Sequence, residues 1–435
     1  MKPISLTTLI TTDLIGITRG RSIPTTDLDK YLQTGCGWVP ANCALTVENH
    51  LVETNPWGSH GDLRLLPSKT SRIRLTMGPN RNCSPLDYIH CDMIQTDGSQ
   101  WNCCPRTLLK NEIEFYRTNL GIELNVAFEH EFTLIDHEKS NQIHPSFSLS
   151  AQREQSQFAS WLISSLRDTN NQPEMFLSEF GPNQYEITCS PSDPLTAADR
   201  AINIRQITRE IARQLNLNVT FSPHPSADLL SNGLHLHVSM KDIHGKQLFY
   251  DKDRPYNLSL IGEYWSAGII HHLGSLCAIT APTPVSYLRL KPNSWSSTYA
   301  CLGYRNRETA LRICPFVEFG SKTVDEQFNI EYRPMDSTCS PHLSLASLLF
   351  AGRYGIQNKL QLSTQNNDSL VYQQNLNELP KTLEESVENL RNNQIFLNYF
   401  PKTLIDIYLA IKTEEISSTK HFDEQSLCEY YSKIY

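Results

Sequence analysis

The sequence predicts an α+β protein with a small β-rich N-terminal domain and a larger second domain, on three observations. The first hundred residues place short β-type runs among Gly, Pro, Asn and Ser. Beyond residue 105, stretches with helical spacing of apolar residues alternate with short strands. Several of these strands carry polar side chains on one face. We place the boundary near residue 103, which gives domains of residues 1–102 and 103–435.

The elements follow in chain order. β-type runs cover residues 4–11, 44–47 and 73–77. The pattern becomes helical at residues 107–116, where apolar side chains recur every three or four positions. Further helices are predicted for residues 151–167, 194–216, 258–280, 342–361 and 382–398.

Composition excludes several classes of protein. The 38 Lys and Arg against 46 Asp and Glu give a net charge of −8, so we expect no nucleic-acid or anionic-membrane partner. No stretch approaches the roughly 18 apolar residues of a membrane span, and the N-terminus does not resemble a secretory signal, so we expect a cytoplasmic protein. The 12 cysteines include no Cys-x-x-Cys pair and are read as free thiols.

Two predicted strands each carry a pair of chemically active side chains on one face. In residues 126–134, Glu129 and Glu131 are two apart, so both lie on one face at a separation of roughly 7 Å. In residues 234–240, His235 and His237 share one face with Ser239, and the opposite face is entirely apolar.

Two further segments repeat this pattern. Glu186 follows Glu179 in one of them, and Glu331 shares a strand face with Arg333 in the other. Any one such strand would more often be a solvated face. Together, five glutamates and His235 make an oxygen-dominated ligand set that suits Mg²⁺ or Mn²⁺ better than zinc.

An arginine cluster complements the carboxylates. It comprises Arg289, Arg305, Arg307 and Arg312. Alone it would more often be a salt-bridged surface. Beside a divalent-metal site, guanidinium groups suit phosphoryl transfer. The sequence has no P-loop and no dinucleotide-binding fingerprint.

In these segments the chain resembles the glutamine synthetase family over nearly its whole length. Six motifs match in order: Phe128-Glu129-His130-Glu131-Phe132, Glu179 through Glu186, Asn232 through His237, Ser286 through Leu290, Asn306-Arg307 with Arg312, and Ile330 through Arg333. The resemblance implies an N-terminal β-grasp domain and a catalytic domain built on a half-barrel of polar-faced antiparallel strands backed by helices.

The resemblance also implies roles for these residues. Glu131, Glu179 and Glu186 would hold one Mg²⁺ or Mn²⁺ ion near the substrate, and Glu129, His235 and Glu331 would hold a second one at the ATP phosphates. His237, Arg307, Arg312 and Arg333 would contact phosphate oxygens, and Arg289 would bind the substrate α-carboxylate. The implied reaction phosphorylates the γ-carboxylate of glutamate from ATP, after which an amine displaces phosphate to give a γ-glutamyl amide. The resemblance further implies a homo-oligomer, expected to be a dodecamer, with sites between subunits.

Two departures bear on the substrates. Ammonia-using members carry a glutamate six residues after the substrate arginine, where this chain has Trp295, and no acidic residue lies in residues 35–47, where the family has an aspartate. An aromatic wall without countercharge suits an organic amine better than ammonium. The family's Asn-Gly pair is replaced by Leu230-Ser231, which leaves glutamate open as the acceptor.

We therefore expect an ATP-dependent ligase that joins glutamate to an organic amine. The alternatives are an ordinary glutamine synthetase that uses ammonia and, from another class, a non-catalytic assembly protein derived from the family. Phosphate release across an amine panel would distinguish the first two.

Overall fold

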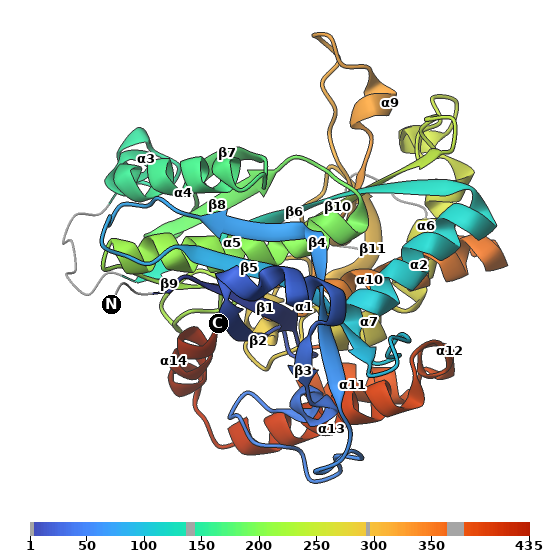
Figure 1. Cartoon of the computed structure of the whole chain (residues 1–435). Helices are drawn as coiled ribbons and strands as arrows, with labels where there is room; N and C mark the ends of the chain where they lie inside the picture. Colours follow the sequence, from blue (N-terminus) through green and yellow to red (C-terminus); the bar gives the residue numbers. More distant parts are fainter. Residues whose placement is uncertain (1–3, 136–143, 293–295, 363–377) are drawn as a thin grey trace.

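The computed structural model describes residues 4–135, 144–292, 296–362 and 378–435. The first part of the chain forms a five-stranded sheet in the order β2-β1-β5-β4-β3, in which β1 and β5 are parallel and the other neighbours antiparallel (Figure 1). Helix α1 (Leu28–Thr34) contacts β4. The strands are β1 (Leu6–Thr12), β2 (Thr18–Pro24), β3 (Cys36–Trp38), β4 (Leu63–Leu75) and β5 (Leu86–Gln95).

One β-type run predicted in this part is wrong. Residues 44–47 form no strand: a 3₁₀-helix, Pro40–Ala44, leads into them, and Leu45 makes only an isolated bridge to Leu51. Pro40, at the start of that helix, has a fixed φ and no N–H, which favours the first turn of a helix. A short apolar run is therefore a weak signal for a strand when a proline precedes it closely.

The second sheet has eight strands among the described residues, in the order β11-β12-β13-β10-β6-β8-β7, with β9 paired to β6. Strands β11 and β12 are parallel and the other neighbours antiparallel. The strands are β6 (Ile122–Ile135), β7 (Pro173–Ser178), β8 (Gln184–Cys189), β9 (Asn218–Thr220), β10 (Leu234–Asp242), β11 (Tyr299–Tyr304), β12 (Thr309–Ile313) and β13 (Ile330–Tyr332).

Helices occupy all the stretches in which the sequence predicts them. Three of these stretches, 151–167, 258–280 and 382–398, are each divided into two helices. Five helices, α1, α8, α9, α13 and α14, lie outside the predicted stretches. The helices beyond α1 are α2 (Pro105–Leu120), α3 (Leu149–Glu154), α4 (Ser156–Asp168), α5 (Pro194–Gln214), α6 (Leu260–His271), α7 (Leu273–Thr280), α8 (Ser286–Arg289), α9 (Val324–Gln327), α10 (Pro341–Asn358), α11 (Leu383–Asn392), α12 (Gln394–Tyr399), α13 (Lys402–Thr419) and α14 (Glu424–Ile434).

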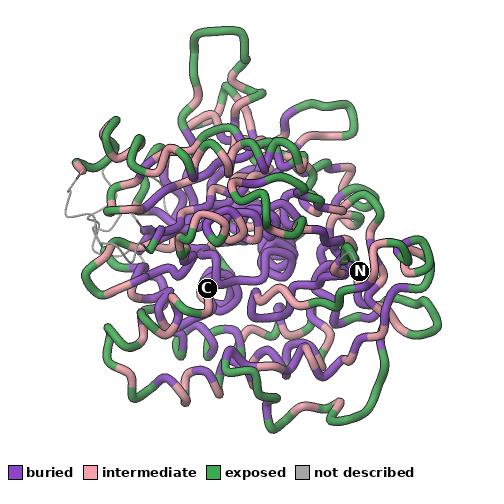
Figure 2. Tube along the Cα trace, turned by 60° about the vertical axis from the view of Figure 1, so that its left-hand side comes forward, coloured by how far each residue is buried: buried purple, intermediate pink, exposed green. Residues whose placement is uncertain are grey.

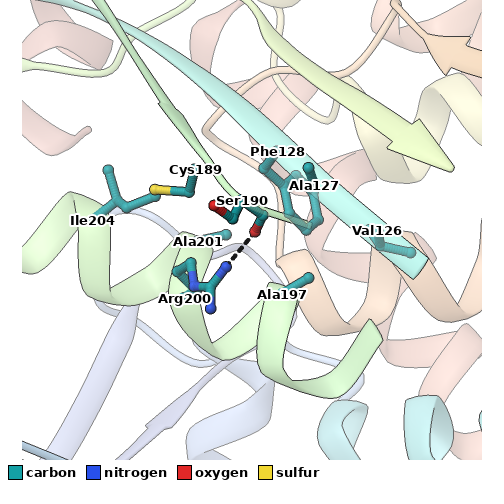
Figure 3. A pocket seen from close by; sticks show the side chains of 9 residues that line it. All are labelled: Val126, Ala127, Phe128, Cys189, Ser190, Ala197, Arg200, Ala201 and Ile204. Atoms are coloured by element: carbon teal, nitrogen blue, oxygen red, sulfur yellow. Dashed lines mark hydrogen bonds between the residues drawn. The ribbon is translucent and has the colours of Figure 1, made fainter. Parts of the chain in front are cut away.

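Helix α5 covers one face of the second sheet. Figure 3 shows it against β6, where Val126 and Phe128 contribute to a cavity of about 10 Å³ and Arg200 donates to the carbonyl of Ser190. Val126 and Phe128 are buried. Because successive side chains on a strand point to opposite faces, the carboxylates of Glu129 and Glu131 point to the other face.

Two apolar clusters join the two sheets, and buried segments fill the centre of the molecule (Figure 2). Leu65 and Met93 of the first sheet belong to the same buried cluster as Leu109 of α2 and Leu236 of β10. The predicted α+β class, with a small N-terminal sheet and a larger sheet backed by helices, is confirmed. The boundary near residue 103, between β5 and α2, stays a prediction. No helix in the described part of the chain is long and apolar enough to cross a membrane.

Candidate active site

The strand register places the predicted polar side chains directly opposite one another. Strand β10 lies at the centre, between β6 and β13. The cross-strand pairs are His235 with Glu129, His237 with Glu331, Glu131 with Glu186, and Arg312 with Glu331. Since paired residues in neighbouring strands have Cβ atoms about 5 Å apart, the four pairs form one continuous polar patch.

Two groups of this patch have the spacing of metal ligands. Glu129, His235 and Glu331 form one and Glu131, Glu186 and His235 the other, and within each group the ligand atoms lie within 4.8 Å of one another. His235 belongs to both. Its Nδ1 lies 3.5 Å from Glu129 and 3.6 Å from Glu331, and its Nε2 lies 3.9 Å from Glu131.

Glu331 is buried between two arginines. Arg312 donates to its Oε2 at 2.6 Å, and Arg333 donates to its Oε1. Burial alone would raise the pKa of Glu331, but the charge of Arg333 and of the neighbouring histidines lowers it to about 2. Glu331 is therefore a permanent carboxylate, and the two guanidinium groups are held beside the first ligand group.

His237 joins Glu129 to the segment before β13. Its Nε2 lies 3.1 Å from Glu129 Oε1, and its Nδ1 lies 2.8 Å from the side-chain oxygen of Asn329. Against the effect of burial, the nearby charge of Glu129 raises the pKa of His237 well above its ordinary value. Asn329 was missed by the sequence reasoning. Extending the period-two pattern of Glu331 and Arg333 by one step back would have found it.

Two other glutamates lie close to neighbouring carboxylates, whose negative charge disfavours their ionised form. Burial, followed by the charges of Glu129 and Glu131, raises the pKa of Glu186 to about 10. Burial, followed by the charge of Glu131, raises the pKa of Glu179 to about 7. Buried carboxylates that repel one another are stabilised by a cation, and this oxygen-rich set with one shared imidazole fits a hard divalent ion such as Mg²⁺ or Mn²⁺. Glu179 lies outside both ligand groups described above.

Glu131 is positioned by the segment before β10. Its Oε2 accepts the Gly233 N–H at 2.8 Å, and Gln184 approaches the same oxygen at 3.4 Å. The Gln184 amide also donates to the carbonyl of Ser231 at 2.8 Å. Three segments distant in sequence are thus tied together at one carboxylate.

The remaining predicted residues differ in their surroundings. Arg289 is buried, and its guanidinium donates to the carbonyl oxygens of Arg333, Pro334 and Met335. Arg307 is exposed, its charge acts on Glu179, and its carbonyl accepts from Arg333 Nε. Trp295 lies outside the described residues.

A patch of carboxylates and histidines that fits divalent cations, flanked by arginines on an antiparallel sheet, defines an enzyme that handles phosphate oxygens. Family models agree: the glutamine synthetase N-terminal domain matches residues 1–101, and the glutamine synthetase catalytic domain matches residues 102–431. The chain belongs to the glutamine synthetase family. It is an ATP-dependent ligase that joins a carboxylate to an amine nitrogen, in a family that uses divalent metal ions.

Relatives in this family differ in the amine that their names specify. The chain is 28% identical to the gamma-glutamylpolyamine synthetase GlnA3 of Streptomyces coelicolor, over 96% of this chain and 91% of that protein. It is 29% identical to a glutamate–isopropylamine ligase of a Pseudomonas species, over 86% and 83%. A solved structure described as a novel glutamine synthase homolog is 47% identical, with a TM-score of 0.94 and coverage of 100% of this chain and 99% of that one.

Proposed function

We propose that this ligase condenses the γ-carboxylate of glutamate with an organic amine. The observation that carries the choice of amine is Trp295, which stands where ammonia-using members of the family have a glutamate. The names of the two relatives that act on polyamines and on isopropylamine support it. Ammonia is the second candidate, because other relatives are named glutamine synthetases.

At least two divalent ions would occupy the site. Glu129, His235 and Glu331 would hold one, and their mutual spacing supports this assignment. Glu131 and Glu186 would hold the other together with Glu179, whose raised pKa reflects its proximity to Glu131. When bound, the ions supply positive charge to the phosphate oxygens and to the carboxylate nucleophile.

The protein's own residues would orient the reactants. Arg312 and Arg333 are preorganised by Glu331 for contact with the transferring phosphoryl group. His237 and Arg307 would contact phosphate oxygens, and Arg289 would bind the α-carboxylate of glutamate.

The reaction has two steps. A γ-carboxylate oxygen forms a bond to the γ-phosphorus of ATP as the bond to ADP breaks. The amine nitrogen then forms the C–N bond as the bond from the acyl carbon to phosphate breaks, and the nitrogen loses a proton. A cytoplasmic location and a dodecamer with sites between subunits complete the proposal. Sedimentation velocity would test the assembly.

The experiment is phosphate release with ATP, glutamate and Mg²⁺ or Mn²⁺ across ammonium, methylamine, n-butylamine and putrescine. We expect turnover with organic amines to exceed turnover with ammonium. Strong turnover with ammonium alone would refute the amine preference and favour the second candidate. Identification of the γ-glutamyl product by mass spectrometry separates condensation from simple ATP hydrolysis. Glu131→Ala should abolish phosphate release, and no turnover with any amine would favour a non-catalytic role.

A further inference from the structure

An aromatic pair is exposed beside the acidic cluster. Phe147 and Phe180 expose 53% and 59% of their surface. Their ring centroids lie 6.1 Å apart and the planes meet at 71°, an edge-to-face arrangement. Two large apolar side chains that contact each other and still face solvent form a surface that can accept an apolar group.

The backbone holds this pair in place. Phe147 has φ of 58°, in the left-handed region that a bulky residue with a Cβ rarely adopts. Ser146 Oγ donates to the carbonyl oxygen of Phe180 at 2.7 Å, which fastens together two segments 34 residues apart in the chain. Backbone strain of this kind persists where the surrounding structure enforces it, and it is concentrated at functional sites. The surrounding structure therefore holds the pair in its exposed position.

The pair borders the candidate active site. The backbone N–H of Phe180 donates to the carboxylate of Glu179. The next residue, Gly181, donates its N–H to the side chain of Gln184, which reaches Glu131. Leu230, 44% exposed, lies on the other side of Gly181, where a Cβ would approach that of Leu230 to 3.4 Å. Apolar surface thus adjoins carboxylates.

We propose that Phe147 and Phe180 form the wall that receives the carbon chain of an aliphatic primary amine. This proposal rests on the proposed function and names the class of amine. The amine nitrogen faces the polar side of the site, while the rings remove the methylenes from water. Burial of one methylene is equivalent to about a fourfold gain in binding. An aromatic face also favours a cation, so a diamine would gain from its distal ammonium group.

The test compares methylamine, ethylamine, n-propylamine and n-butylamine in the wild type, Phe180→Ala and Phe147→Gly. Glycine is chosen at position 147 because it adopts a positive φ without strain. The matched control is Ile243→Ala, which removes a side chain that is 63% exposed just beyond β10. Circular dichroism and sedimentation velocity of each variant report its folding and its assembly.

We expect kcat/KM of the wild type and the control to rise by up to about 60-fold over the three added methylenes, at about fourfold each. Both Phe variants should flatten this rise to below about tenfold, mainly through KM. An unchanged rise in both variants would overturn the proposal. So would equal losses for methylamine and n-butylamine, or a changed oligomeric state with an unchanged rise, which would make the pair a contact between copies of the chain. Turnover with ammonium alone would instead refute the proposed function.

The proposal also predicts how the enzyme uses putrescine. The kcat/KM for putrescine should exceed that for n-propylamine in the wild type, and this difference should disappear in Phe180→Ala. A putrescine preference that survives in both Phe180→Ala and Phe147→Gly would assign the distal ammonium group to another part of the site and overturn the cation–aromatic part of the proposal.

Discussion

Loading of the site with divalent metal should release protons from its carboxylates. Burial and neighbouring carboxylates raise the pKa of Glu186 to about 10 and that of Glu179 to about 7, whereas Glu331 is ionised, with a pKa of about 2. At pH 7 these two carboxyl groups of the metal-free site therefore hold about 1.5 protons, nearly one on Glu186 and about half of one on Glu179. Metal coordination requires the deprotonated carboxylates, so these protons leave as the ions bind.

Isothermal titration calorimetry with Mn²⁺ in buffers of different ionisation enthalpy counts the protons released. We expect Glu186 and Glu179 to contribute about 1.5 protons per loaded site at pH 7 and about 1.1 at pH 8, with apparent affinity that rises between pH 6 and pH 8. Glu186→Gln should lower the count by about one, and the exposed-site control Glu388→Gln should leave it unchanged. Zero release, or the same count in Glu186→Gln, would refute the idea that these carboxylates share one cation site.

Three further predictions concern the site and its support. His235→Ala removes the ring common to both ligand groups and should lower both Mn²⁺ affinity and phosphate release by at least about 100-fold, measured by titration and by a phosphate assay. Asp199→Asn should cost about 1.5–3 kcal/mol in urea unfolding, because the buried Arg106 loses its bidentate partner and keeps only Asp92, at 2.8 Å; a cost below about 1 kcal/mol would contradict this. Burial lowers the pKa of His90 and of His342 below the ordinary value of 6.5. As the pH drops below about 6.5 the unfolded chain therefore takes up protons before the folded one, and stability should fall. A thermal midpoint that is constant between pH 7 and pH 5 would argue against this prediction.

Much of the site is encoded in period-two alternation. That pattern alone places Glu129 with Glu131 and His235 with His237 on common strand faces. It cannot say which residue lies opposite which, because β6 and β10 are about a hundred residues apart and their register depends on everything that packs between them. The pairing of His235 with Glu129, on which one ligand group depends, is therefore information that only the fold supplies.

Helix α13 shows the opposite case, in which the sequence pattern misleads. Lys412 and Glu415 are fully buried, so charged residues interrupt the stripe of apolar positions by which an amphipathic helix is recognised. The charges are satisfied inside the protein: Lys412 bonds to Glu415 at 2.7 Å, and the Tyr431 hydroxyl donates to the same carboxylate at 2.5 Å. A buried ion pair of this kind is invisible to a rule that expects apolar residues in the core.

The charge balance of the site links the first ligand group to the neighbouring arginines. In the arrangement described here, Arg312 and Arg333 offset Glu331, and His237 offsets Glu129. A divalent cation held by Glu129, His235 and Glu331 would add two positive charges beside the same carboxylates. Guanidinium groups keep their charge in proteins, so the added positive charge has to be matched by an anion. A triphosphate supplies that anion. We infer that the cation at Glu129, His235 and Glu331 and the triphosphate beside Arg312 and Arg333 bind together.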